Sequence, residues 1–220
     1  MTFPLSDPPF IVIEGLDGAG TTTQTRRVAE MLRDRGQPTV TSCEPSRGPV
    51  GTLIRQMLSL RITVPDLKGG HRPVGRETLA LLFAADRLDH LEAEVEPTLA
   101  VGKAAISDRY YHSSLVYQGD VDEDDSVDYG WVRRINERAR VPDLTVFLEA
   151  PVELCLERLA DRERREIYES RRKLARLEKR YDEVMSFLEK EGQPVLRLDA
   201  SQAVEELTER IVEAVLSSSS

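Results

Sequence analysis

Short apolar runs of strand length alternate along the chain with longer segments whose apolar residues recur every three or four positions. The strand-type runs occupy residues 10–14, 38–43, 104–107, 144–148 and 195–198. The helix-type segments occupy residues 22–35, 50–60, 76–99, 129–139, 152–162, 170–191 and 203–216. This alternation predicts an α/β fold, in which an open and mostly parallel sheet is covered by helices on both faces.

Two segments lack either periodicity and are predicted to be loops. Residues 61–75 are interrupted by Pro65, Gly69, Gly70 and Pro73. Residues 120–128 hold six acids in nine positions, a density that is typical of a solvated loop. We interpret 10–216 as one domain, preceded by an irregular lead-in at 1–9 and followed by a disordered tail at 217–220.

Acidic residues follow four of the predicted strands. Open parallel sheets bind their ligands beyond the carboxyl ends of the strands, where the connecting loops converge. We therefore expect one edge of the sheet to carry Asp17, Glu44, Asp108 and Asp199.

The loop after the first predicted strand resembles a phosphate-binding loop. Residues 15–22 follow the pattern G-x-x-x-x-G-K-[ST] except at the seventh position, where Thr21 replaces lysine. Its glycines allow backbone N–H groups to surround a phosphate at a helix N-terminus, and the hydroxyl of Thr22 stands where such loops ligate Mg²⁺. The sequence predicts a phosphate site without its usual cation; the alternative is a glycine-rich turn without a ligand.

Phe83 and Arg87 lie four residues apart in the predicted helix 76–99 and therefore share one face. An aromatic ring beside a guanidinium suits a planar base, on which the ring stacks while the arginine donates to a carbonyl oxygen. The alternative is that Phe83 belongs to the core and that Arg87 pairs with Asp86 or Asp89. Taken alone, the pattern favours this alternative, because apolar helix faces usually pack in a core.

Polar side chains also follow the predicted strand 104–107. Asp108, at a strand end, can hold a water of a Mg²⁺ ion, and Arg109 can bind a phosphate through two parallel hydrogen bonds. Ser113 lies close behind them, and Gln118 offers both a donor and an acceptor, as the edge of a base requires. The alternative is an ion pair between Asp108 and Arg109 with no chemical role.

Arginines gather at the end of one predicted helix and in the segment before the next, at Arg158, Arg162, Arg164 and Arg165. A short charged segment at about residues 160–170 could close as a lid and bring arginines to a transferring phosphoryl group. The alternative is a solvent-exposed helix face, because the run from 161 to 180 mixes both signs of charge.

Composition narrows the range of functions. The chain of 220 residues has a formal net charge of −9, so we expect no nucleic acid and no membrane as partners, and any phosphate site must be a local basic pocket. We find no apolar stretch of membrane-spanning length and no secretion signal. Cys43 and Cys155 are too few for a disulfide framework and are predicted to be reduced thiols of a cytoplasmic protein.

As a set, these motifs resemble those of the thymidylate kinase family. The resemblance extends from about residue 10 to 215 and is carried by residues 13–20, 44–45, 82–87, 108–110, 113–114, 117–119, 142–144 and 198–201. A general phosphate loop does not predict the motifs in the middle of the chain. The resemblance implies phosphorylation of dTMP by ATP with Mg²⁺, a five-stranded parallel sheet with a mobile lid, and a homodimer.

The resemblance also implies roles for individual residues. Phe83 would stack on thymine, Arg87 and Gln118 would bind its edge, Arg109 would hold the dTMP phosphate, and Tyr168 would crowd the 2′ position of the sugar. The residues expected to bind ATP are Gly15, Asp17, Gly18, Ala19, Gly20, Thr21, Thr22, Thr23 and Asp199. The residues expected to bind dTMP are Asp17, Glu44, Arg47, Phe83, Arg87, Arg109, Ser113, Gln118 and Tyr168. The expected catalytic residues are Asp17, Arg109 and one or more of Arg162, Arg164 and Arg165; the expected metal-site residues are Thr22 and Asp108.

Two positions depart from the family pattern. Thr21 brings no charge, and losing one stabilising group of this kind can slow a reaction about a hundred- to a thousand-fold. Cys43 stands where the family has an arginine that grips the acceptor phosphate, and Arg47 is near enough in sequence to replace it.

Three hypotheses follow. The chain is an active or weakened thymidylate kinase whose lid arginines and Arg109 supply the missing charge, a nucleotide-binding protein that has lost catalysis, or a kinase of the same fold for another nucleotide or a nucleoside.

Overall fold

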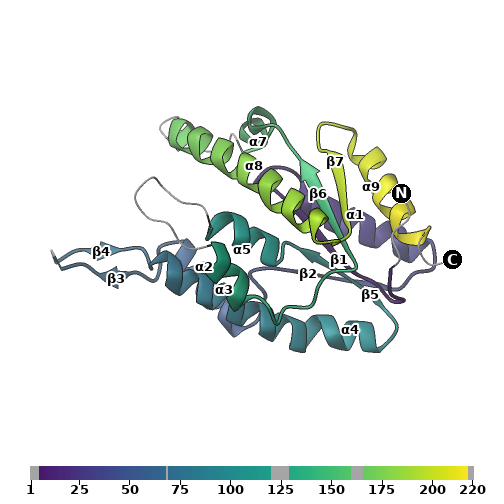
Figure 1. Ribbon diagram of the computed structural model, residues 1–220, viewed down its shortest axis with the longest axis horizontal. Helices are drawn as coiled ribbons and strands as arrows, with labels where there is room; N and C mark the ends of the chain where they lie inside the picture. Colours follow the sequence, from purple (N-terminus) through teal and green to yellow (C-terminus); the bar gives the residue numbers. More distant parts are fainter. Residues whose placement is uncertain (1–4, 68, 120–128, 160–165, 218–220) are drawn as a thin grey trace.

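A computed structural model of the chain describes residues 5–67, 69–119, 129–159 and 166–217. Within these residues, a five-stranded sheet with the order β2-β5-β1-β6-β7 forms the centre of the molecule (Figure 1). Every neighbouring pair of strands in it is parallel, which confirms the predicted sheet. The strands are β1 (Phe10–Gly15), β2 (Thr39–Cys43), β5 (Ala104–Asp108), β6 (Leu144–Glu149) and β7 (Val195–Asp199).

The sequence of β1 explains its central place. Its four apolar residues, Phe10 to Ile13, are completely buried, and a continuous apolar run is typical of a strand covered on both faces. Ile11 lies opposite Ile106 of β5 on one side and opposite Leu144 of β6 on the other. The loop after β1 therefore emerges at the middle of the carboxyl edge of the sheet.

Helices cover both faces of the sheet, with α1 and α9 packed together on one side and α5 and α8 packed together on the other (Figure 1). None of the helices formed by the described residues combines the length and the apolar character that a bilayer span requires. A π-helical turn, Leu91–Val95, joins α3 to α4. The helices are α1 (Thr21–Asp34), α2 (Pro49–Leu58), α3 (Arg76–His90), α4 (Glu96–Ala100), α5 (Tyr111–Tyr117), α6 (Tyr129–Ile135), α7 (Val152–Arg158), α8 (Glu166–Lys190) and α9 (Val204–Leu216).

The prediction of an unstructured loop at 61–75 was wrong in part. Two short strands, β3 (Val64–Pro65) and β4 (His71–Arg72), pair there as an antiparallel hairpin. The amide of Asp66 donates to the carbonyl of Gly70 at 2.8 Å and closes the turn. The glycines that suggested a loop instead form the tip of a hairpin, which projects from the end of the molecule (Figure 1).

The prediction of one uninterrupted helix at 76–99 was also wrong in part, because the π-helical turn divides it. Pro97 explains the interruption. A proline within a helix has no N–H to donate and crowds the carbonyl four residues earlier, which is that of Ala93. A wider turn just before it relieves this crowding.

Two further helices end earlier than the sequence predicted. In α6 the side-chain amide of Asn136 donates to the carbonyl of Val132 at 2.7 Å, and the helix stops at Ile135 instead of residue 139. In α7 the helix ends at Arg158 instead of residue 162. The acidic segment 120–128 and the predicted lid residues 160–165 lie outside the described residues.

The close approach of α2 to the segment before it depends on Gly51. A Cβ atom added at Gly51 would lie 2.1 Å from the carbonyl oxygen of Ser46 and 2.8 Å from Oδ1 of Asp86. Asp86, in α3, accepts hydrogen bonds from the amide and the hydroxyl of Ser46, at 2.7 and 2.6 Å. The hydrogen bonds between Ser46 and Asp86 therefore hold the chain that follows β2 against α3.

We predict that Gly51→Ala destabilises the protein by about 1–3 kcal/mol, because the added methyl group overpacks a site closed by backbone atoms. The matched control is Gly75→Ala, where the structure places no atom within 4 Å of the new Cβ; this change should stay within about 0.5 kcal/mol. Urea unfolding of both variants measures the difference. Equal midpoints for the two variants would contradict the packing argument.

Candidate functional site

The loop between β1 and α1 has the backbone of a phosphate cradle. Gly20 caps α1 with a φ of 101°, and Gly18 has a φ of 89°, a left-handed conformation that side chains rarely adopt. A Cβ atom on Gly18 would also lie 2.8 Å from the carbonyl oxygen of Cys155. Helix α1 starts with no side-chain cap and no acid in its first turn, so its N–H groups are available to an anion.

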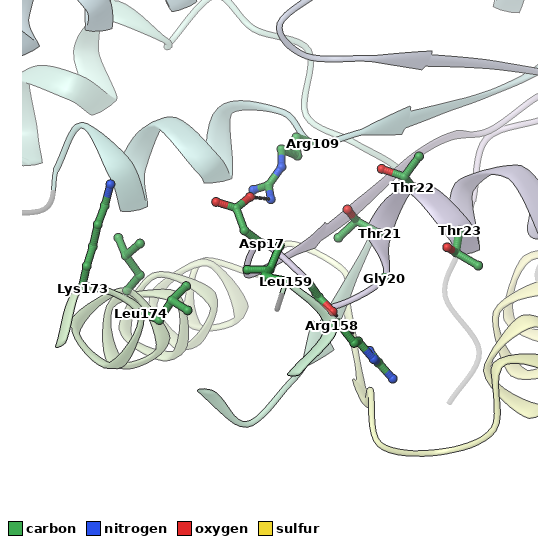
Figure 2. Close-up of a pocket in the computed structure, with 12 residues that line it drawn as sticks. Asp17, Gly20, Thr21, Thr22, Thr23, Arg109, Arg158, Leu159, Lys173 and Leu174 are labelled. Carbon is green, nitrogen blue, oxygen red and sulfur yellow. Dashed lines mark hydrogen bonds and ion pairs between the residues drawn. The ribbon is translucent and has the colours of Figure 1, made fainter. Parts of the chain in front are cut away.

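This loop lines a cavity of about 760 Å³ (Figure 2). We call it the donor cavity. Three cationic side chains of the described structure line it, namely those of Arg109, Arg158 and Lys173. The remaining lining residues are Asp17, Gly18, Gly20, Thr21, Thr22, Thr23, Leu159, Leu174 and Leu177.

The first turn of α1 presents three threonines. Thr21, which occupies the lysine position of the motif, is only 6% exposed. The hydroxyl of Thr22 donates to Oδ2 of Asp108 at 2.5 Å, so the loop and the end of β5 meet here. The other carboxylate oxygen of Asp108, Oδ1, is buried and has no hydrogen-bond partner in the described structure.

Arg158 binds the outer side of the same loop. Its guanidinium donates to the carbonyls of Gly18 and Ala19, both at 3.2 Å, and to that of Ala200 at 3.1 Å. These bonds tie the end of α7 to the loop. Figure 2 shows the side chain pointing away from Asp17 and Arg109.

Arg109 follows β5 directly and has a φ of 74°. Its Nη2 donates to Asp17 at 2.6 Å, and its Nη1 donates to the hydroxyls of Ser113 and Tyr181, both at 3.1 Å (Figure 2). The guanidinium also lies over the ring of Tyr117, 5.5 Å from its centre. Groups from the β1 loop, α5 and α8 thus fix one arginine.

Glu14, a completely buried carboxylate of β1, supports the same cluster. It accepts hydrogen bonds from the amide of Tyr110 at 2.8 Å, the hydroxyl of Ser113 at 2.8 Å and the hydroxyl of Tyr181 at 3.1 Å. Burial by itself raises the pKa of Glu14, but the contacts with His112 and the charge of Arg109 outweigh it and lower the pKa below its ordinary value. The carboxylate is therefore charged at neutral pH and compensates the arginine.

A second cavity, of about 350 Å³, adjoins the first and shares Asp17, Arg109 and Lys173 with it. We call it the acceptor cavity. Its other lining residues are Glu44, Pro45, Leu58, Phe83, Arg87, Tyr110, Ser113, Ser114, Tyr117 and Gln118. Three buried oxygens of these residues, on Tyr110, Tyr117 and Gln118, have no partner in the described structure. Buried polar atoms are usually paired, so the cavity is suited to a polar ligand.

The floor of the acceptor cavity is a buried ion pair. Arg87 donates to Glu44 at 2.6 Å and to the hydroxyl of Ser114 at 3.1 Å, and it also donates to the side-chain oxygen of Asn136. The other oxygen of Glu44 lies 3.2 Å from Nδ1 of His90. The side chains of Arg87 and Glu44 are 1% and 2% exposed, so neither charge is compensated by water.

The structure contradicts the core and local-ion-pair alternative for Phe83 and Arg87. Phe83 is half-buried and lines the acceptor cavity instead of belonging to the buried core. Arg87 pairs with Glu44 and not with Asp86 or Asp89. Arg87 does not pair with its neighbours in sequence because α3 packs against the chain that follows β2. This packing brings Glu44 to Arg87, whereas Asp86 accepts hydrogen bonds from Ser46.

The suspected ion pair between Asp108 and Arg109 is likewise not among the contacts of the described residues. Asp108 accepts the hydroxyl of Thr22, whereas Arg109 turns to Asp17. Arg109 has a left-handed backbone conformation. The side chain of Asp108 contacts the start of α1, whereas that of Arg109 contacts the loop after β1.

The remaining expected site residues either line neither cavity or fall outside the described part of the chain. Asp199, at the end of β7, accepts hydrogen bonds from Ser201 and lines a separate cavity beside Glu149. Arg47 is exposed and is not a lining residue of either cavity. Tyr168 belongs to α8, and its side chain is outside the described part, as are Arg162, Arg164 and Arg165.

Sequence reasoning missed several residues of the site. Glu14 carried a signal, because it is an acid at the end of a fully apolar strand. Tyr181 and Asn136 carried none, since their partners are more than 40 residues away in sequence. Lys173 was hidden within a helix rich in charges of both signs.

The parallel sheet, with a glycine-rich loop that leads from its central strand into a helix N-terminus, defines a P-loop kinase fold. Sequence comparison narrows this class. Residues 13–211 match the thymidylate kinase family, and the chain belongs to that family.

Two archaeal relatives illustrate the similarity. A protein of Methanococcus aeolicus named "Probable thymidylate kinase" is 34% identical over 210 residues, which cover 94% of this chain and 95% of the relative. A protein of Thermococcus onnurineus with the same name is 35% identical over 206 residues, which cover 94% and 96% of the two chains. The similarity therefore extends over nearly the whole of each protein.

We predict that Arg87→Met destabilises the protein by about 3–5 kcal/mol, because it removes the arginine that compensates the buried carboxylate of Glu44. The control is Arg27→Met, which removes a 2.8 Å ion pair with Glu205 at the surface and should cost less than about 1 kcal/mol. Denaturant unfolding at neutral pH measures both. Similar losses of unfolding free energy in the two variants would show that the buried ion pair stabilises the protein no more than the surface ion pair does.

Proposed function

We propose that the protein transfers the γ-phosphoryl group of ATP to dTMP and forms dTDP and ADP. The observation that carries this proposal is the pair of adjoining cavities. One contains the phosphate loop, the other combines an aromatic ring with unpaired polar groups, and Asp17, Arg109 and Lys173 line both. Membership of the thymidylate kinase family supports the choice of substrates.

In the acceptor cavity, we assign the thymine base to the space beside Phe83. The ring of Phe83 stacks on the base, while Arg87 and Gln118 bind its polar edge. The unpaired Oε1 of Gln118 supports this assignment, because a donor on the base would satisfy it. We also assign contacts with dTMP to Glu44, Ser113, Tyr168 and Arg47, and contacts with ATP to Asp199.

In the reaction, an oxygen of the dTMP phosphate attacks the γ-phosphorus of ATP, and the bond from that phosphorus to the bridging oxygen breaks. The attacking phosphate is already ionised at neutral pH, so no strong general base is required. Arg109 holds the acceptor phosphate, and the N–H groups of the loop hold the donor phosphates. Such a reaction depends on positioning and on charge stabilisation.

Thr22 and Asp108 fit the Mg²⁺ that accompanies ATP. The unpaired, buried Oδ1 of Asp108 is an acceptor suited to a metal-bound water, and the hydroxyl of Thr22 lies beside the same carboxylate. When bound, the ion neutralises charge on the phosphate oxygens. We further assign a lid to about residues 160–170, from which Arg162, Arg164 or Arg165 reaches the ATP phosphates.

A second candidate function rests on Thr21, which gives the loop a hydroxyl where the motif has a cation. In this case the protein binds dTMP without turning it over and acts as a sensor or a subunit. Calorimetric binding of dTMP together with no formation of dTDP would favour it.

Comparing rates with dTMP, dUMP, dCMP and thymidine tests a kinase of different specificity. We place the protein in the cytoplasm, which agrees with two unbridged cysteines.

We predict that the purified protein forms dTDP from dTMP, ATP and Mg²⁺, and that Phe83→Ala raises the KM for dTMP about tenfold or more, because base stacking contributes about 1–3 kcal/mol. Thr78→Ala is the control, since Thr78 lies on the same helix and is exposed. Its KM should not change. A folded wild-type protein that makes no dTDP above the uncatalysed level would refute the kinase assignment.

We also propose a homodimer, and we predict a mass of about 50 kDa in solution by light scattering, twice the 24.8 kDa of the chain. Exposed leucines on α2 and α3, at Leu53, Leu81 and Leu88, support an interface there. Leu88→Glu should shift the mass to that of one chain, whereas Val101→Glu, at another exposed apolar position, should not. A single-chain mass for the wild type at micromolar concentration would contradict the proposal.

A further inference from the structure

The donor cavity has a charge requirement that its loop does not meet. Phosphoryl transfer spreads negative charge over the oxygens of the moving group, and the loop lysine of the motif normally compensates part of it. Thr21 stands in that place, is almost buried and brings no charge. A cation from another element must approach the same space if transfer is to be efficient.

Two of the three cations that line the donor cavity are already engaged. Arg158 lines the cavity, but it donates to three backbone carbonyls, of which two belong to the loop, and it points away from Asp17 and Arg109 (Figure 2). Arg109 is held by Asp17, Ser113 and Tyr181 next to the acceptor cavity. Neither side chain is free to turn towards the position of Thr21 without breaking several hydrogen bonds.

Lys173 differs from both. It is exposed and has no hydrogen bond or ion pair with any residue that the structure describes. Its helix is fixed beside the donor cavity, because Leu174 and Leu177 are buried and line that cavity too. Figure 2 shows the side chain extended from α8 across the space between this helix and the helix that follows Arg109. Its four-carbon stem therefore carries a mobile charge along the border of both cavities.

We propose that Lys173 supplies the cation that Thr21 leaves absent from the loop, as a catalytic residue that binds the phosphoryl group in transit between donor and acceptor. This inference rests on the proposed function. An anion in the donor cavity attracts the ammonium group, which turns from solvent to the oxygens of that anion. The lysine keeps its protons throughout, and it neither forms nor breaks a covalent bond. Its effect is electrostatic and is greatest when charge on the moving group is greatest.

The first experiment measures the steady-state formation of dTDP by Lys173→Met. We expect kcat to fall about ten- to a hundred-fold with little change in the KM for dTMP, somewhat less than for a fully enclosed group. Lys173→Arg, which keeps the charge, should recover most of the rate. The matched control is Lys179→Met on the same helix, where the lysine is 80% exposed and lies 3.9 Å from Glu183; its kcat should stay within about twofold of wild type.

The second experiment places the same substitution in a Thr21→Lys background. A lysine in the loop restores the charge by the usual route, so loss of Lys173 should then cost less than about threefold. Melting curves establish that each variant is folded. This dependence on background separates a substitute cation from a residue that merely supports α8.

Each other result would overturn the inference. A kcat for Lys173→Met within twofold of wild type removes the catalytic role, and equal losses in both backgrounds show that Lys173 does not replace the loop lysine. A wild-type protein without turnover refutes the proposed function instead. In that case calorimetry with AMPPNP and Mg²⁺ still decides: Lys173→Met should bind AMPPNP about fivefold more weakly than Lys179→Met, and equal affinities would overturn the proposal.

Discussion

The position of Arg109 is the constraint that joins the parts of this site. Its backbone turns into a left-handed conformation directly after β5, and its guanidinium contacts Asp17, Ser113 and Tyr181. These partners come from the loop after β1, from α5 and from α8. These segments lie far apart in the sequence and meet only because they pack at the central sheet. Glu14 lies beneath them as a buried counter-charge. Because Arg109 borders both cavities, the two cavities share one wall.

We propose that the distribution of charge around that wall compensates for the lysine that the loop lacks. Arg109 and Arg158 are held by fixed hydrogen bonds, so they shape the cavities. Lys173 is held by none among the described residues and can follow its ligand. A fixed loop lysine and a mobile helix lysine differ in entropy and in solvation, but they deliver the same charge.

Local patterns were sufficient for most of the fold. The apolar run of β1 predicted a central buried strand, and the glycine-rich loop predicted the phosphate cradle at the start of α1. The hairpin after α2 was missed because it depends on how one turn closes, and the π-helical turn was missed because periodicity alone does not show how a helix accommodates Pro97. The residues of the acceptor cavity followed from the family resemblance, because Phe83 and Arg87 by themselves favoured a core and a local ion pair.

The sequence by itself determined the order along the chain of the five strands of the central sheet, the location of the phosphate loop and the absence of its lysine, because all three are properties of neighbouring residues. Only the tertiary structure decided which charges meet. Glu44 and Arg87 are 43 residues apart, and Arg109 and Asp17 are 92 apart. Both pairs follow from the packing of segments that are distant in sequence, and for Glu44 and Arg87 burial also excludes water and leaves each charge dependent on the other. No periodic pattern in the sequence predicts which charged residues pair.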